Sequence, residues 1–248
     1  MVALVINSNL SSLNAQRHLE ENRSQLGSSI NRISSGIRIE GASDGGAELT
    51  LTENIRADVL ALQQGSRNLN DGTAFVKTAE GALNEISGIL LRLRSLASQS
   101  ANGTIGDVER ISTDLEYQAS IRELDRIVAT TEFNGTFLLD GTLAASQPDS
   151  AHNVLQLGVD SRSDNQIDLN NILDLTNVGT AALGLTGSNI TTQGAAFQAL
   201  NDLTASIDDL IQVRGRVGTA QIRMLHALDN LQVQEENLNA AVSTIRDA

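Results

Sequence analysis

The C-terminal end of the chain carries the feature that most limits its fold, an apolar repeat over residues 200–245. Steps of alternately three and four residues from Leu200 reach fourteen positions, of which eleven are apolar. These eleven are Leu200, Leu203, Ile207, Leu210, Val217, Met224, Leu228, Leu231, Leu238, Val242 and Ile245. Such spacing predicts one long helix whose apolar stripe, a packing seam, lies against a partner helix. The exceptions, Arg214, Gln221 and Glu235, share one sublattice of the repeat and are expected to set its register.

A second repeat of the same kind predicts a long helix over residues 55–97. Its positions are Ile55, Val59, Leu62, Ser66, Leu69, Thr73, Val76, Ala79, Leu83, Ile86, Leu90, Leu93 and Ala97. Residues 4–39 before it are mostly amphipathic, and Gly41 and Gly45-Gly46 predict a hinge after them.

A third helix is expected after the break at Asn102-Gly103. Thr104 and Asp107 have the spacing of a capping box. The apolar face of this helix is predicted to hold Val108, Ile111, Leu115, Ile121, Leu124 and Val128. Long helices with complementary stripes favour a bundle. The expected fold class is therefore mainly α, a long antiparallel helical rod or bundle of coiled-coil type with a small β-hairpin region.

The hairpin is expected in the segment between the helical arms, residues 141–190. Apolar and polar residues alternate there on both sides of a turn at residues 161–165. The alternating apolar residues are Leu155, Leu157 and Val159 before the turn, and Ile167 and Leu169 after it. Alternation around a turn is typical of two antiparallel strands.

Composition argues against several classes of function. The chain of 248 residues has 30 acidic and 17 basic side chains and a net charge of −13, which disfavours binding to nucleic acid or to an anionic membrane surface. Cysteine is absent, which excludes disulfides and thiolate chemistry. Four phenylalanines, one tyrosine and one proline favour long unbroken helices over a globular catalytic domain.

No motif indicates an active site. His18, His152 and His226 lie far apart, and no pair has the spacing of a zinc site. Four aspartates in the loop-rich stretch could attract a divalent cation, although their order does not match a calcium loop. These are Asp160, Asp164, Asp168 and Asp174. The sequence therefore predicts no enzyme activity, no catalytic residue, no cofactor and no metal site.

Several segments resemble the motifs of bacterial flagellins. Residues 31–39, Asn-Arg-Ile-Ser-Ser-Gly-Ile-Arg-Ile, are similar to the N-terminal signature of that family, as is Ala42-Ser43-Asp44. Further segments resemble the family's rod helices and the turn that follows the second of them. These are residues 67–72, 78–83, 131–135, 235–238 and 245–248. The chain departs from the family at Asp44-Gly45-Gly46-Ala47, where flagellins usually have Asp-Asp-Ala-Ala.

The resemblance implies a structural subunit of the bacterial flagellar filament, which self-assembles through helical terminal arms for motility. It also implies that the chain is exported unfolded by the flagellar export machinery with the help of a chaperone. The expected location is extracellular, on the flagellum at the cell surface. Other copies of the chain are the expected partners, with no nucleic acid and no membrane among them.

Four regions are expected. Residues 1–42 are an N-terminal amphipathic filament-core segment, 43–140 the N-terminal arm of the helical rod, 141–190 a short β-rich outer region, and 191–248 the C-terminal arm. Flagellins normally continue beyond the position of Ala248 into a helix that pairs with the N-terminal one. Without that mate, residues 4–37 are expected to be disordered in a monomer or bound to neighbouring chains, and the chain alone is not expected to polymerise.

Some flagellins also contact an innate immune receptor through the rod. Residues 90–96 match that stretch, and Arg92, Leu96 and Glu116 fit its pattern, whereas Ser95 replaces an acidic residue. The alternative interpretation is an ordinary helix surface that packs against neighbouring subunits.

Two other functions remain open at this stage. The hook–filament junction protein shares the N-terminal signature, although residues 235–238 and 245–248 favour flagellin. A cell-surface flagellin homologue that binds a polysaccharide or a metal ion is the other alternative. Its ligand would lie in the acidic stretch of residues 140–174.

Overall fold

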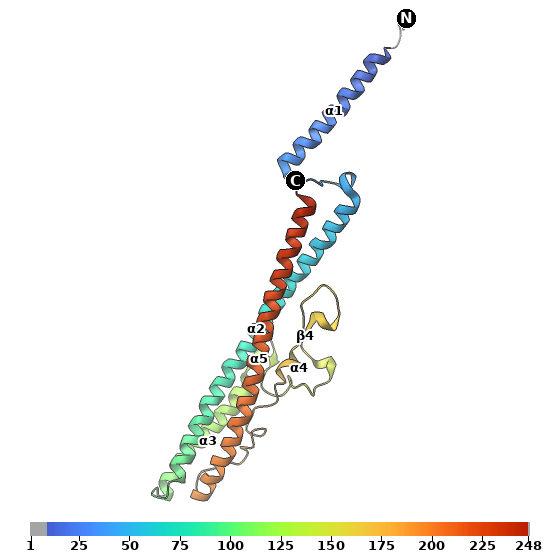
Figure 1. Ribbon diagram of the computed structural model, residues 1–248. Helices are drawn as coiled ribbons and strands as arrows, with labels where there is room; N and C mark the ends of the chain where they lie inside the picture. The colour runs from blue at the N-terminus through green and yellow to red at the C-terminus, as the bar shows by residue number, and fades with distance from the viewer. Residues whose placement is uncertain (1–8, 248) are drawn as a thin grey trace. The chain divides into compact units, whose positions relative to one another are not determined.

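The computed structural model describes residues 9–247, and helices dominate it (Figure 1). The long helices are α1 (Leu10–Ser35), α2 (Ala42–Ala101), α3 (Asp107–Thr130) and α5 (Gln193–Arg246). The short turns η1 (Asp149–Ala151) and η2 (Ser163–Asn165) and the short helix α4 (Leu169–Leu173) lie between α3 and α5. Two antiparallel strand pairs join β1 (Glu132–Phe133) to β2 (Thr136–Phe137) and β3 (Val154–Gln156) to β4 (Gln166–Asp168). The predicted class, mainly α with a small hairpin region, is confirmed.

Contacts divide the chain into two compact units. One consists of Met1–Leu60 and Gln234–Ala248, of which residues 9–60 and 234–247 are described. The other is Ala61–Val233. Helices α2 and α5 each contribute residues to both units.

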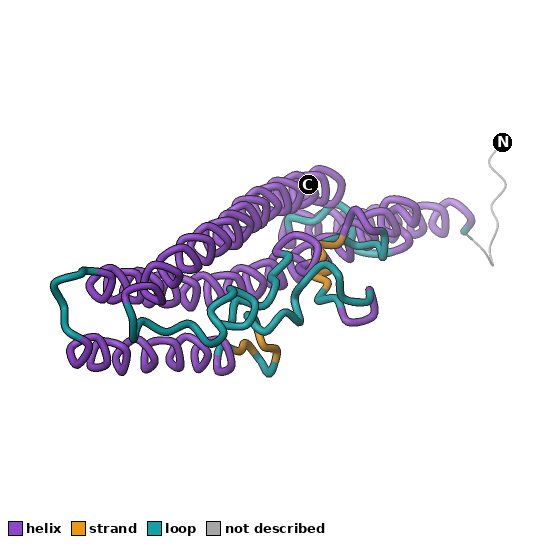
Figure 2. Tube along the Cα trace, turned by 90° about the horizontal axis from the view of Figure 1, so that it is seen from below, coloured by secondary structure: helices purple, strands orange, loops and turns teal. Residues whose placement is uncertain are grey.

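The core of the second unit lies between three helical segments that run side by side (Figures 1 and 2). They are α2 from residue 61, α3, and α5 up to residue 233. The apolar positions predicted on α2 form the centre of this core. Eight of them are fully shielded from solvent: Leu69, Val76, Ala79, Leu83, Ile86, Leu90, Leu93 and Ala97. Each large aliphatic side chain buried in this way contributes about 1.5–3 kcal/mol to folding.

On helix α5, one of the two predicted apolar rows is buried, and a different row of residues is buried in place of the other. Leu203, Leu210, Val217, Met224 and Leu231 repeat every seven residues and are at most 7% exposed. The second buried row is Ala199, Ser206, Val213 and Ala220. It starts one residue before the predicted row of Leu200, Ile207, Arg214 and Gln221, whose members are half-buried at the edge of the interface. Arg214 and Gln221 of the predicted row therefore lie at the edge of the interface. The core positions beside that row are occupied mostly by small side chains.

The apolar face predicted for α3 is confirmed in its second half, where Leu124 and Val128 are buried, and is wrong in its first half. Val108, Ile111 and Leu115 are 76%, 55% and 68% exposed. The buried residues are Arg110, Tyr117, Leu124 and Val128. The predicted capping box is also wrong, since α3 begins after Gly106 with no side-chain cap. The first half of α3 turns polar side chains inward because the segment of residues 175–190 packs on that face.

Polar contacts fasten this segment to the helices. The Tyr117 and Ser188 hydroxyls lie 2.7 Å apart, and the Asp125 carboxylate accepts hydrogen bonds from the N–H and hydroxyl of Thr180 at 3.0 and 2.8 Å. The hydroxyls of Ser100 and Ser206 donate to backbone carbonyls of the same segment at 2.5 and 2.7 Å. The segment is thus part of the folded unit, although it has no strand.

The β3–β4 hairpin occurs where the alternation predicts it, with Leu155 opposite Ile167. Its strands are short, and turns and loops make up most of residues 141–190. The hairpin lies directly on α2, where two glycines one heptad apart face it. A Cβ atom at Gly65 would overlap the Leu157 carbonyl group, and one at Gly72 would overlap the Leu155 side chain.

The first unit contains α1 and a contact between residues 37–38 and residues 246–247. Helix α1 is capped by the Asn9 side chain, which accepts from the Ser12 N–H at 3.1 Å, and it has no buried residue. After it, the Arg38 N–H donates to the Arg246 carbonyl at 2.7 Å. Helical geometry is interrupted at Gly45 (φ 173°, ψ 82°), within the predicted hinge. Residues 1–8 of the predicted filament-core segment, residues 1–42, lie outside the described residues, and residues 10–35 are helical.

Candidate functional site

The loop acids contact other parts of the chain. Asp168 contacts His152 at 2.7 Å, and Asp174 accepts from the Ala145 N–H at 2.9 Å and lies 3.6 Å from Arg216. Asp160 lies 3.4 Å from Arg162. Within residues 9–247, no three His, Asp or Glu side chains gather as they would around a metal ion. Asp168 and Asp174 therefore hold the loops to other segments, whereas Asp160 pairs with a residue two positions away and Asp164 lies in η2.

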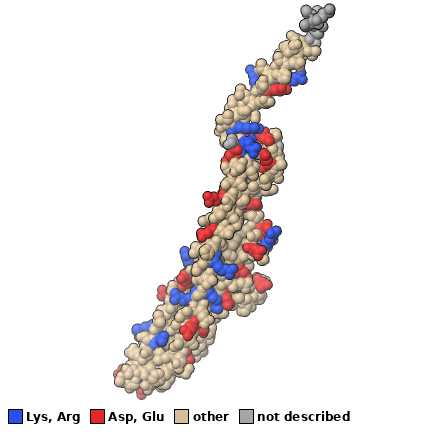
Figure 3. All heavy atoms as spheres, in the orientation of Figure 1, with Lys and Arg blue, Asp and Glu red and all other residues tan. Residues whose placement is uncertain are grey.

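No helix between residues 9 and 247 combines the length and the apolar character that crossing a bilayer requires. Figure 3 shows acidic and basic side chains interspersed on the face drawn, with no continuous basic area there.

The predicted seam residues of α5 lie in two settings. In the second unit, Leu203, Leu210, Val217, Met224 and Leu231 are buried, while Leu200, Ile207 and Leu228 are half-buried. In the first unit, Leu238, Val242 and Ile245 are half-buried. Gln221, which the sequence marks as a register residue, donates to Glu80 on α2 at 2.5 Å. This contact joins α2 and α5 at one defined register.

The three residues of the predicted receptor contact are not equally accessible. The Arg92 Nε donates to Glu116 at 2.8 Å, and both side chains are at least half exposed. Leu96 is 2% exposed and belongs to the core. A protein that binds this surface can therefore touch Arg92 and Glu116 but not Leu96.

Exposed apolar side chains form rows on the outer faces of the second unit. Val108, Ile111 and Leu115 are spaced three and four residues apart, so they lie on one face of α3. On α5, the residues Ile211, Ile222 and Leu225 are 53–59% exposed. Soluble monomers rarely expose contiguous apolar patches, which mark interaction surfaces.

Helix α1 has the longest such row in the first unit. It exposes Leu10, Leu13, Leu19, Leu26, Ile30 and Ile33, each by more than half. The last four are separated by seven, four and three residues, so they share one face. The sequence indicates this face through its amphipathic pattern, whereas it gives the wrong face for the start of α3. On α3, the spacing of seven residues between Arg110 and Tyr117, which are both buried, is the pattern that would have identified the buried face.

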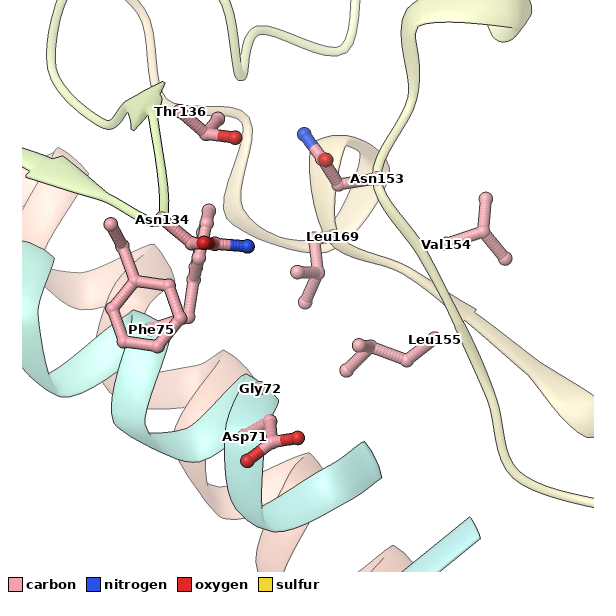
Figure 4. Close-up of a pocket in the computed structure, with 10 residues that line it drawn as sticks. Asp71, Gly72, Phe75, Asn134, Thr136, Asn153, Val154, Leu155 and Leu169 are labelled. Atoms are coloured by element: carbon pink, nitrogen blue, oxygen red, sulfur yellow. The ribbon is translucent and has the colours of Figure 1, made fainter. Parts of the chain in front are cut away.

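A cavity of about 240 Å³ lies between α2 and the outer loops (Figure 4). The rings of Phe75 and Phe133 meet edge to face at its side, with centroids 5.6 Å apart. Asp71, Asn134 and Asn153 supply polar groups at its wall. The volume is below the range of about 300–1,000 Å³ that is usual for ligand pockets. Asp71 is the one titratable side chain among the residues that line the cavity.

Comparison with known proteins agrees with this arrangement. The bacterial flagellin N-terminal helical region matches residues 6–144, and the bacterial flagellin C-terminal helical region matches residues 200–248. A flagellin of Halalkalibacterium halodurans is 37% identical over 98% of this chain and 86% of its own length. The crystal structure of Bacillus cereus flagellin covers 71% of this chain and 94% of its own, with a TM-score of 0.54 and 29% identity.

A hook-associated protein shares the fold alone. The structure titled a putative flagellar hook-associated protein from Vibrio parahaemolyticus has a TM-score of 0.65 at 16% identity and covers 82% of this chain and all of its own. The family matches include both helical ends, and the H. halodurans relative spans almost the whole chain. The chain therefore belongs to the bacterial flagellin family and is a structural subunit of the flagellar filament.

Proposed function

We propose that copies of this chain pack against one another in the filament through the apolar rows that each copy leaves exposed. The observation that carries this proposal is helix α1, which has 26 residues and buries none of them. Burial of an aliphatic side chain contributes about 1.5–3 kcal/mol, so a row of four favours association with another helix. The occupant is a segment of a second copy, because a filament is built from repeated subunits.

In this proposal, the buried seam residues of α5 stabilise the single subunit and do not form the contacts between subunits. Leu210, Val217 and Met224 are at most 2% exposed within one chain, so they hold each subunit together. Contacts between subunits then use side chains outside that core. Such a contact joins two different surfaces of identical subunits, and a head-to-tail contact of this kind extends into an open helical assembly.

The subunit acts without catalysis, as a building unit outside the cell. Passage of an unfolded chain through an export channel is compatible with the absence of cysteine and with a single proline. The export machinery and a chaperone are the proposed partners before assembly. The acidic side chains of residues 140–174 then remain solvated on the outer side of the subunit.

The test replaces the flagellin gene of a flagellated bacterium with the gene for this protein. Filaments in electron micrographs are expected from the unchanged chain, in contrast to the expectation from the sequence that it does not polymerise alone, because α1 is helical and its apolar row is free to pack. Ile30→Asp with Ile33→Asp places charges on the exposed α1 row, and filament yield is expected to fall about tenfold or more, the effect of at least about 1.4 kcal/mol on one contact. Asn22→Asp on the same helix is the matched control.

Secretion and assembly are scored separately. The double variant is expected in the medium as a soluble chain, because the exposed Ile30 and Ile33 side chains take no part in the core of the monomer. Filaments of normal length from the double variant would overturn the role of α1. Secreted chains without filaments from the unchanged protein would overturn the proposal as a whole.

A further inference from the structure

His152 is the most enclosed titratable side chain of the outer loops. It follows η1, and its side chain is 3% exposed. The ring Nδ1 lies 2.7 Å from Asp168 Oδ2, and the ring Nε2 lies 2.9 Å from the Gln147 carbonyl oxygen. Both ring nitrogens are therefore in hydrogen bonds, and each partner is an oxygen atom.

Neither oxygen partner has a proton to give. The Gln147 carbonyl can only accept. Both oxygens of Asp168 also accept from Asn171, Oδ1 from its N–H at 3.2 Å and Oδ2 from its side-chain amide at 2.6 Å. Two hydrogen bonds to two acceptors require an N–H on both ring nitrogens, which is the imidazolium form.

The charges around His152 favour the same form. Asp168 and Asp149 are the charged groups that act on the ring, and both are acidic. The hydrogen bond that the ring donates to Asp168 raises the pKa of His152 above its ordinary value, against the opposing effect of burial. The Gln147 carbonyl and the charges of Asp168 and Asp149 raise it further.

The position of Asp168 links the ring to the hairpin. Asp168 ends β4, pairs with Val154 on β3, and caps α4. Beside it, the Leu169 N–H donates to the Asn153 carbonyl and the Asn153 N–H donates to Asn170 Oδ1, both at 2.9 Å. His152 thus ties the loop at Gln147 to the junction of β4 and α4.

We propose that His152, the Gln147 carbonyl and Asp168 form a pH-operated latch, the His152 latch, which is closed while the imidazole carries two protons and opens when it loses one. The neutral ring has a single N–H. It must leave either the Gln147 carbonyl or the Asp168 carboxylate without its donor in a buried place, which is unfavourable. Opening the latch loosens the β3–β4 hairpin and the Asn153 wall of the cavity in Figure 4.

The direction of the pH dependence follows from the raised pKa. The stabilising effect is fully present below the pKa of about 6.5 that histidine has in an unfolded chain. It is lost as the pH rises through the higher pKa of the folded state. The latch therefore opens on the alkaline side of about pH 6.5.

The first test is NMR of the imidazole nitrogens in the full chain, with the chain unfolded in concentrated urea as the reference. His152 of the folded chain is expected to keep both ring protons above the pH of about 6.5 at which a histidine of an unfolded chain loses one. In Asp168→Asn, which retains an acceptor oxygen but no charge, the His152 transition is expected to move toward that of the unfolded chain. A His152 ring that titrates at or below the pH of the unfolded chain would overturn the latch.

The second test follows amide hydrogen exchange, corrected for the intrinsic effect of pH, from about pH 6 to about pH 9. In the unchanged chain, protection of residues 153–170 is expected to fall severalfold while protection of α2 and α5 stays constant. His152→Gln is expected to show low protection of the hairpin at every pH, with normal helix protection proving that it folds. His226→Gln is the matched control and should behave as the unchanged chain. An unchanged pH dependence in His152→Gln would contradict the proposal.

Discussion

The backbone carbonyl of Leu157 lies so close to Gly65 that a Cβ atom on residue 65 would overlap it. One turn further along α2, the Asn68 side chain donates to the Gln156 carbonyl at 2.8 Å. The hairpin therefore rests on the backbone of α2 and is oriented there by a polar contact. The glycine is needed because of this approach, and not because of its own backbone conformation.

This relationship predicts opposite effects for two glycines of the same helix. Gly65→Ala is expected to lower the free energy of unfolding by about 1–3 kcal/mol, because the hairpin must move away. At Gly81, a Cβ atom would meet nothing within 4 Å, so Gly81→Ala is expected to stabilise α2 by about 0.5–1 kcal/mol. Urea unfolding measures both. Equal effects of the two substitutions would contradict the close approach.

The packing register of α5 is testable with two adjacent residues. Leu210 is 2% exposed and Ile211 is 59% exposed. Leu210→Ala is expected to cost about 2–5 kcal/mol through the cavity that it leaves. Ile211→Ala is expected to change stability by no more than about 0.5 kcal/mol. If Ile211→Ala lowered the free energy of unfolding more than Leu210→Ala, the buried face of α5 would include Ile211 instead of Leu210.

Much of this fold can be predicted from the sequence, because large apolar residues at heptad spacing indicate which face of a helix is buried. The stripe from Leu69 to Ala97 is shielded from solvent as predicted, and the hairpin forms at the alternation around Leu155 and Ile167. The second row of α5 is different, since Ala199, Ser206 and Ala220 are buried. Small residues carry little apolar signal, so a pattern based on leucine selects their larger neighbours.

The buried face in the first half of α3 could not be predicted from the helix alone. Polar groups are turned inward there because a distant segment supplies their partners. The Asp114 carboxylate accepts from the Ile190 N–H at 2.9 Å, and the Gln118 side chain donates to the Ser188 carbonyl at 2.9 Å. Residues 175–190 have no periodic pattern, so nothing in the sequence shows where they pack.

Arg110 and Arg92 are expected to differ strongly in their effect on stability. Arg110 is 5% exposed and donates to the carbonyls of Asn102 and Ile105 at 2.9 and 3.0 Å, which joins the end of α2 to the start of α3. Arg110→Ala is expected to cost about 1.5–3 kcal/mol, because a charged hydrogen-bond donor is lost. Arg92→Ala removes an exposed ion pair and is expected to cost at most about 1 kcal/mol. Thermal unfolding compares the two, and a smaller loss at Arg110 would contradict this assignment.

The last prediction concerns the titration of Tyr117, the one tyrosine of the chain. Its side chain is fully buried, and its hydroxyl lies 2.7 Å from that of Ser188. Burial raises the pKa of Tyr117, and Asp202 and Asp114 add to this effect, while the hydrogen bond with Ser188 opposes it. The neutral phenol is therefore favoured by the fold. Since an unfolded chain releases this proton at about pH 10, stability is expected to fall as the pH rises from there toward the folded pKa.

A single tyrosine makes the measurement direct, because tyrosinate absorbance in the near ultraviolet comes from Tyr117 alone. The native chain is expected to show its transition above about pH 10, and the chain in concentrated urea at about pH 10. Tyr117→Phe keeps the ring in the core and should abolish the signal, together with this part of the alkaline destabilisation. A native transition at or below that of the unfolded chain would mean that water reaches the phenol, and that residues 175–190 do not cover α3 at Ser188.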